Sequence, residues 1–143
     1  MCGSKDEAIK KFKNDKQSSF KCLLVDLDKD PSHREVDIKE NTLTNHSDLA
    51  FYMIQKMEAW FISQPDILEN KWKSDCFYGF KKNNPQTIKD PDEELKTILK
   101  RNLNKKYNKV NDAVDLLMTL KPEELKNEFE DFNHLVQLIR KEL

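Results

Sequence analysis

The chain has 143 residues, of which 37% are hydrophobic and only two are glycine, so it can bury a sizeable core in a helix-rich body. Its 25 lysines and arginines nearly balance 26 aspartates and glutamates, and the net charge of −1 excludes a general attraction to nucleic acid. Three cysteines without paired spacing exclude a zinc site or a disulfide scaffold and favour a cytoplasmic location. Because the sequence shows neither a signal peptide nor an apolar run of bilayer length, we expect no membrane partner.

The first predicted elements are a short helix and a buried strand. Ser4 and Glu7 have the spacing of a capping box at a helix start. The apolar run over residues 20–25 predicts a strand buried on both faces. The polar segment over residues 31–47 predicts an exposed loop near the end of that strand, a position where loops often carry function.

A second strand and then a series of helices are predicted beyond this loop. The apolar run over residues 49–54 predicts the second buried strand, and the apolar spacing over residues 57–62 suits a helix. Proline is favoured in the first turn of a helix. Further helices are therefore predicted to start at Pro65, Pro91 and Pro122, with one more over residues 111–120.

These elements predict one domain of the α/β class over residues 1–143. Its α/β part, residues 1–84, would hold a parallel sheet flanked by helices, because buried apolar strands that alternate with helices are typical of parallel sheets. Residues 85–143 would form a helical C-terminal third.

Two acidic residues follow the first predicted strand. Asp26 and Asp28 are two positions apart, and residues with this spacing on a strand face the same side. The carboxyl end of a strand in an open α/β sheet is a usual place for ligand groups, and one or two carboxylates commonly hold Mg²⁺. The pair therefore predicts a metal site, although aspartate and proline also suit a simple polar turn over residues 26–31.

A third acidic residue stands among apolar neighbours. Glu58 lies where the second strand gives way to a helix, so it could bring another carboxylate toward Asp26 and Asp28. A buried charge needs a partner, and a metal ion would supply one. Alternatively, Glu58 is a first-turn residue that the helix dipole favours.

Basic residues gather later in the chain, around Tyr107. This basic segment could bind phosphates by salt-sensitive contacts while the tyrosine stacks on a base. The alternative is a solvated helix end, where positive charge complements the dipole. The candidate nucleic-acid-binding residues are Lys100, Arg101, Lys105, Lys106 and Lys109.

Three segments together resemble a known family. They are residues 2–8, residues 23–26 and the run Met53-Ile54-Gln55-Lys56-Met57-Glu58-Ala59-Trp60. The last run is similar to the signature Met-Val-Gln-x-Met-Glu-Ala-Trp of an uncharacterised bacterial family with a TOPRIM-type fold, whose members often lie beside ATPase genes in presumed phage-defence loci. Six of the eight signature positions are identical, and the resemblance covers nearly the whole chain.

The resemblance implies a TOPRIM-like site that uses Mg²⁺ to cut or join phosphodiesters. Such sites join a glutamate from the first strand to an Asp-x-Asp pair, which Asp26 and Asp28 match, while Glu58 matches the signature glutamate. Relatives carry a strand with its own glutamate before the segment that corresponds to Cys2-Gly3. We expect the chain to be a fragment, to receive that strand from another polypeptide, or to be a reduced form.

Two functions from different classes follow as hypotheses. The first is a Mg²⁺- or Mn²⁺-dependent nuclease of a bacterial defence system, acting on DNA or RNA with Asp26, Asp28 and Glu58 as its catalytic and metal-binding residues. The second is a non-catalytic subunit that docks on an ATPase. An incomplete sheet would also leave an exposed edge strand, which could pair with a second copy of the chain.

Overall fold

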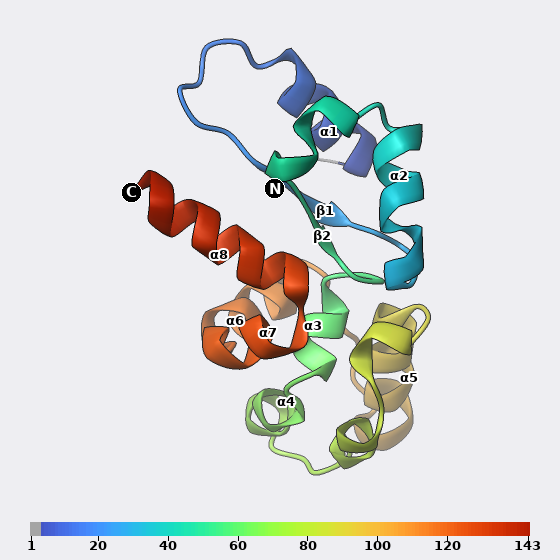
Figure 1. Ribbon diagram of the computed structural model, residues 1–143. Coiled ribbons are helices and arrows are strands. Elements are labelled where there is room, and N and C mark those ends of the chain that lie inside the picture. The colour runs from blue at the N-terminus through green and yellow to red at the C-terminus, as the bar shows by residue number, and fades with distance from the viewer. Residues whose placement is uncertain (1–3) are drawn as a thin grey trace.

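The computed structural model describes residues 4–143 and shows a two-stranded parallel sheet flanked by helices (Figure 1). Strand β1 is Leu23–Asp26 and strand β2 is Ala50–Met53, with Leu23 opposite Ala50 and Asp26 opposite Met53. The predicted α/β class, with a parallel sheet and a helical C-terminal part, is confirmed. Cys2 and Gly3, which open the first segment of the family resemblance, lie outside the described residues.

Apart from α2, which was not predicted, the helices of the described part follow the predicted order, and the helix starts predicted at Ser4, Pro65, Pro91 and Pro122 are confirmed. Ser4 caps its helix in a capping box with Glu7. The α-helices are α1 Lys5–Asn14, α2 Arg34–Glu40, α3 Glu58–Ile62, α4 Pro65–Trp72, α5 Pro91–Leu103, α6 Asn111–Thr119, α7 Pro122–Glu128 and α8 Glu130–Glu142. Short 3₁₀ turns are η1 Pro31–His33, η2 Thr44–Leu49, η3 Tyr78–Lys82 and η4 Pro85–Thr87.

The loop predicted over residues 31–47 is wrong, because this segment forms η1, α2 and part of η2. Asp30 starts η1 by accepting a hydrogen bond from the Ser32 backbone N–H. Ile38 and Leu43 are almost fully buried, at 2% and 0% exposure, so a few apolar side chains anchor an otherwise polar helix. The polar residues that suggested a loop belong to the solvent-exposed face of this segment.

Strand β1 begins at Leu23, three residues later than predicted, and extends to Asp26. The Lys21 ammonium donates hydrogen bonds of 2.6 Å to the backbone carbonyls of Phe12 and Asp15, which ties the preceding segment to the end of α1. This connection holds the chain in an irregular path until Leu23.

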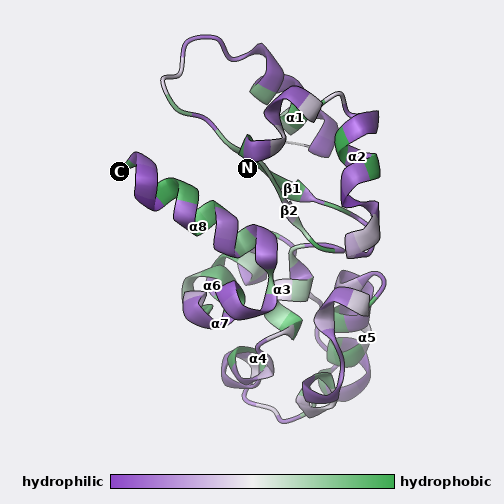
Figure 2. Ribbon diagram, in the orientation of Figure 1, coloured by the Kyte–Doolittle hydropathy of each residue, from purple (hydrophilic) through white to green (hydrophobic). Residues whose placement is uncertain are grey.

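The sheet packs against helices and contributes to the core. Helix α1 contacts β1, and α8 contacts β2. Leu23, Val25 and Phe51 are buried as expected for strands between helices, whereas Met53 is half-buried. Figure 2 shows hydrophobic residues along the strands and on parts of the surrounding helices, with hydrophilic residues elsewhere. The prediction that the first strand is buried on both faces is wrong, because Leu24 is 38% exposed.

The outer edge of β2 is closed by two side chains. Asp131 of α8 accepts a 2.7 Å hydrogen bond from the Tyr52 N–H, and Arg34 of α2 donates to the Ala50 carbonyl at 3.2 Å. The Arg34 Nε lies 3.0 Å from both Asp131 oxygens, so the pair takes the place of a neighbouring strand.

The outer edge of β1 is different. The bond from the Leu27 N–H to the Met53 carbonyl and the parallel register turn the backbone groups of Leu24 and Asp26 away from β2. Within residues 4–143 these groups have no hydrogen-bond partner. The expectation that this edge pairs with another chain stays a prediction.

Candidate active site

The two strands end in a pair of left-handed residues. Asp28 has φ of 63° and Gln55 has φ of 59°, and the Asp28 N–H donates to the Gln55 carbonyl at 2.6 Å. The Gln55 N–H in turn donates to the Lys29 carbonyl at 3.0 Å. Because β1 ends at Asp26, strand alternation does not set the direction of Asp28, which is exposed.

Asp26 is half-buried at the end of β1, and one of its oxygens is held in place. Its Oδ1 accepts a 2.9 Å hydrogen bond from the Met57 N–H. The pKa of Asp26 is raised to about 6, mainly by burial and also by the charges of Glu58 and Asp28, against the opposing effects of that hydrogen bond and of Lys109. Glu58 and Asp28 therefore both lie within electrostatic reach of Asp26.

Glu58 is the first residue of α3 and is only 2% exposed. The Tyr107 hydroxyl donates a hydrogen bond of 3.1 Å to Glu58 Oε1. The expected stacking of Tyr107 on a base is wrong, because its side chain is buried in the core. Burial, together with the charge of Glu58 and this hydrogen bond, raises the pKa of Tyr107 well above its usual value. Tyr107 therefore stays a hydrogen-bond donor, and Glu58 has no ion pair within residues 4–143.

The donor atoms fit Mg²⁺ or Mn²⁺ in chemistry. Asp26 Oδ2, Glu58 Oε2 and the Asp28 carboxylate have no hydrogen-bond partner among the described residues. In that same part of the chain, no three acidic, histidine or cysteine side chains converge closely enough to enclose an ion. Mg²⁺ commonly uses one or two carboxylates and completes its octahedron with waters, so a two-carboxylate site suits this arrangement.

A buried aspartate that the sequence did not single out lies beside these acids. Asp92, in the first turn of α5, is 4% exposed, and its Oδ1 accepts a 3.0 Å hydrogen bond from Lys56. Lys109 lies 3.4 Å from Asp92 Oδ2, and Lys96 lies 4.0 Å from it. Asp92 looked like an ordinary first-turn residue, and Lys56 occupies the variable position of the family signature, so neither position carried a signal of its own.

The basic segment divides into two parts. Lys109 reaches the acidic residues, and its charge lowers the pKa of Asp26. Lys100 donates to the side chain of Asn104 at the end of α5, which is a local cap. Lys100, Arg101, Lys105 and Lys106 are exposed, and within residues 4–143 they have no ion pair.

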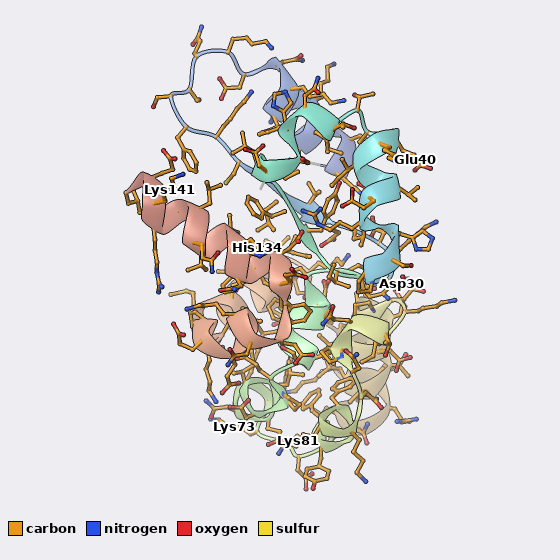
Figure 3. All side chains as sticks on the ribbon, viewed as in Figure 1. Asp30, Glu40, Lys73, Lys81, His134 and Lys141 are labelled. Carbon is orange, nitrogen blue, oxygen red and sulfur yellow. The ribbon has the colours of Figure 1, made fainter. Side chains whose placement is uncertain are left out.

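A cavity of about 350 Å³ opens beside Asp28. Figure 3 shows Asp30 at the start of η1, close to the segment that leads into α5. The volume falls in the range of small-ligand sites, and the walls are polar and charged. The lining residues are Asp28, Lys29, Asp30, His33, Gln55, Lys89 and Asp90.

Comparison with known proteins places the chain in one family. Residues 4–140 match the model of the family described as Domain of unknown function (DUF4276), so the chain belongs to that family. No curated protein and no solved structure matches it. No helix within residues 4–143 is both long and apolar enough to cross a membrane.

Proposed function

We propose that this protein is a Mg²⁺-dependent phosphodiester-cleaving enzyme of the TOPRIM type that serves in a bacterial defence system. Asp26, Asp28 and Glu58 are the catalytic carboxylates, and DNA or RNA is the substrate. The family match covers the whole domain without assigning an activity, so the proposal rests on the chemistry of the acidic residues.

One observation carries the proposal. Asp26 is held half-buried beside two further carboxylates, and burial and the charges of those carboxylates raise its pKa to about 6. A protein gains no stability from like charges in this arrangement, and perturbed carboxylates at the carboxyl end of a strand are typical of functional sites. A divalent cation would neutralise the repulsion.

The residues have distinct roles in this mechanism. The Met57 N–H fixes Asp26, and the Tyr107 hydroxyl fixes Glu58, so both carboxylates are oriented before the metal binds. Asp26, Asp28 and Glu58 would hold Mg²⁺, which would supply Lewis-acid polarisation of a phosphoryl oxygen and activation of a water for in-line attack. The cavity beside Asp28 leaves room for the substrate.

Calorimetry with Mn²⁺ tests the site. We expect the wild-type chain to bind Mn²⁺ weakly and Asp26→Asn to abolish the binding heat, because the substitution removes a ligand charge. Asp48→Asn is the matched control, since it makes the same change at an exposed aspartate in η2. Binding heat that survives in Asp26→Asn, or no heat with the wild type, would overturn the site assignment.

An activity assay tests the reaction. We expect slow Mn²⁺-dependent cleavage of plasmid DNA or of an RNA transcript, lost on addition of EDTA and in Asp28→Asn. Rapid cleavage that persists in EDTA would contradict a metal-dependent mechanism. Identical products from Asp28→Asn would remove that residue from the site.

A second candidate function is a non-catalytic subunit that docks on an ATPase. An apolar stripe on and before α6 favours it: Val110, Val114, Leu117 and Met118 are exposed by 40% to 83% at a spacing that places them on one helix face. If this function is correct, a purified ATPase partner will bind the wild-type chain, and Met118→Lys will abolish that binding. The same variant will leave Mn²⁺ binding unchanged.

A further inference from the structure

Two lysines from different parts of the chain share one buried carboxylate. Lys56 precedes α3, Lys109 precedes α6, and both ammonium groups contact Asp92 in the first turn of α5, at 3.0 Å and 3.4 Å. Asp92 has 5% of its side chain exposed, whereas Lys56 and Lys109 have 22% and 53% exposed. The carboxylate is therefore inside, and both lysine side chains that contact it keep part of their surface in solvent.

Each lysine is close in the chain to a residue that holds an acid of the candidate site. Lys56 directly precedes Met57, whose N–H donates to Asp26, and Lys109 is two residues after Tyr107, whose hydroxyl donates to Glu58. Asp90, which lies 3.7 Å from Lys56, also lines the cavity beside Asp28. The lysine pair therefore lies beside the candidate site, and Lys56 lies beside one wall of the cavity.

An ammonium group has three N–H donors and can serve two anions at once. Lys56 uses one short contact on Asp92, so donors remain for a ligand. A phosphodiester carries a negative charge that the acidic residues would repel, and two fixed cations beside them would offset this repulsion. A phosphate group is the ligand that this arrangement fits.

We propose that Lys56 and Lys109 bind the phosphate group of the substrate, and that Asp92 is the positioning residue that holds both ammonium groups toward it. The inference rests on the proposed phosphodiester chemistry for its role in turnover. Phosphate binding by the two lysines can be measured without any metal or cleavage.

The first experiment measures binding alone. The protein, labelled with ¹³C at the lysine ε-carbons, is titrated with inorganic phosphate in EDTA. We expect the Lys56 and Lys109 signals to shift in a saturable way, while the Lys126 signal stays fixed because Lys126 pairs with the exposed Glu123 at 3.1 Å and has no contact with Asp92. Signals of all exposed lysines moving together would overturn the inference, because they would show a general salt effect.

The second experiment measures turnover of bis(p-nitrophenyl) phosphate with Mn²⁺. Asp92→Asn removes a negative charge near the substrate, so simple electrostatics would lower KM and leave kcat unchanged. If Asp92 positions the two lysines, kcat should instead fall by about 10- to 100-fold, because the ammonium groups that donate to the transition state lose their fixed direction. Glu93→Gln is the control, since it removes the same charge from the same helical turn without contacting Lys56 or Lys109.

Combined variants separate positioning from a loss of folding. If Asp92 acts through the lysines, adding Asp92→Asn to the Lys56→Met/Lys109→Met double variant will lower kcat no further. A further drop of the same size would show an independent structural role and overturn the assignment of Asp92. If phosphate shifts both lysine signals but no variant or wild type cleaves, the proposed function fails and the phosphate site stands.

Discussion

Two groups of buried carboxylates lie along the same small sheet, and they differ in what balances their charge. At the outer edge of β2, Asp131 accepts bonds from Arg34 and from the Tyr52 N–H. Nearby, Asp37 accepts bonds from Lys5 at 2.7 Å and from the Tyr52 hydroxyl at 2.6 Å. At the end of β1, by contrast, Asp26 and Glu58 have one neutral donor each and no ion pair within residues 4–143.

The difference distinguishes carboxylates whose charge is balanced by contacts within the fold from carboxylates whose charge is not balanced in this way. Burial opposes the charge of Asp37, but the bonds from Lys5, Tyr52 and Asn41 outweigh it and lower the pKa of Asp37. The pKa of Asp26 moves the other way, because burial and like charges dominate. Removing a carboxylate should therefore have opposite effects on stability in the two groups.

The largest expected effect is at Asp131. Asp131→Ala leaves the Arg34 guanidinium without its bidentate partner and the Tyr52 N–H without an acceptor. Breaking a buried ion pair from one side costs about 3 to 5 kcal/mol of unfolding free energy. Urea denaturation measures the loss, and Glu130→Ala, whose side chain is 84% exposed in the same turn, should change stability by about 0.5 kcal/mol or less.

Asp26→Asn should do the opposite. At neutral pH the substitution removes a charge that burial and two carboxylates disfavour, while an amide oxygen can still accept from the Met57 N–H. We expect the free energy of unfolding to rise by about 1 to 3 kcal/mol, with partial exposure of the site limiting the gain. A loss of stability comparable to that of Asp131→Ala would place Asp26 with the structural carboxylates.

The pH dependence of stability sharpens the same contrast. The pKa of Asp26 is about 6 in the folded chain against an ordinary value of 3.8, so the folded state binds the extra proton. Its contribution to stability is full below about pH 4 and is lost as the pH rises through about 6. Asp26→Asn should remove this decline, which denaturation at intervals between pH 4 and 7 will measure. Parallel curves for the two proteins would contradict the raised pKa.

The sequence predicted the elements better than the site. The helix starts at Pro65, Pro91 and Pro122 could be predicted because proline is favoured in the first turn of a helix, so the residue itself indicates where the helix begins. Helix α2 was missed because it is anchored mainly by Ile38 and a following Leu43, too few apolar residues to show helical periodicity. Tertiary burial, which the sequence does not display, fixes that helix.

The candidate site needed contacts between distant segments. Asp26, Asp28 and Glu58 could be selected because each is an acid at the end of an apolar run. Asp92 and Lys56 could not, and Tyr107 was selected for base stacking instead of for its bond to Glu58, since only the packing of α5 and the 104–110 segment near α3 brings these residues together. The same sequence pattern predicted all five basic residues to bind nucleic acid. Within the described residues, only Lys109 contacts the candidate site.

The smallest expected effect tests whether Glu58 belongs with the unbalanced carboxylates. Tyr107→Phe keeps the buried ring and removes one neutral donor from Glu58 Oε1, so the free energy of unfolding should fall by about 1 kcal/mol. Tyr78→Phe, at a tyrosine that is 57% exposed, is the control and should leave stability unchanged. If Glu58 helps to bind the metal, the loss of its orienting bond should also weaken Mn²⁺ binding by about tenfold, as is common for residues that position a ligand. A drop in stability without any change in Mn²⁺ affinity would remove Glu58 from the metal site. Asp26 and Asp28 would remain in it, because those two carboxylates do not depend on the Tyr107 hydroxyl for their hydrogen bonds.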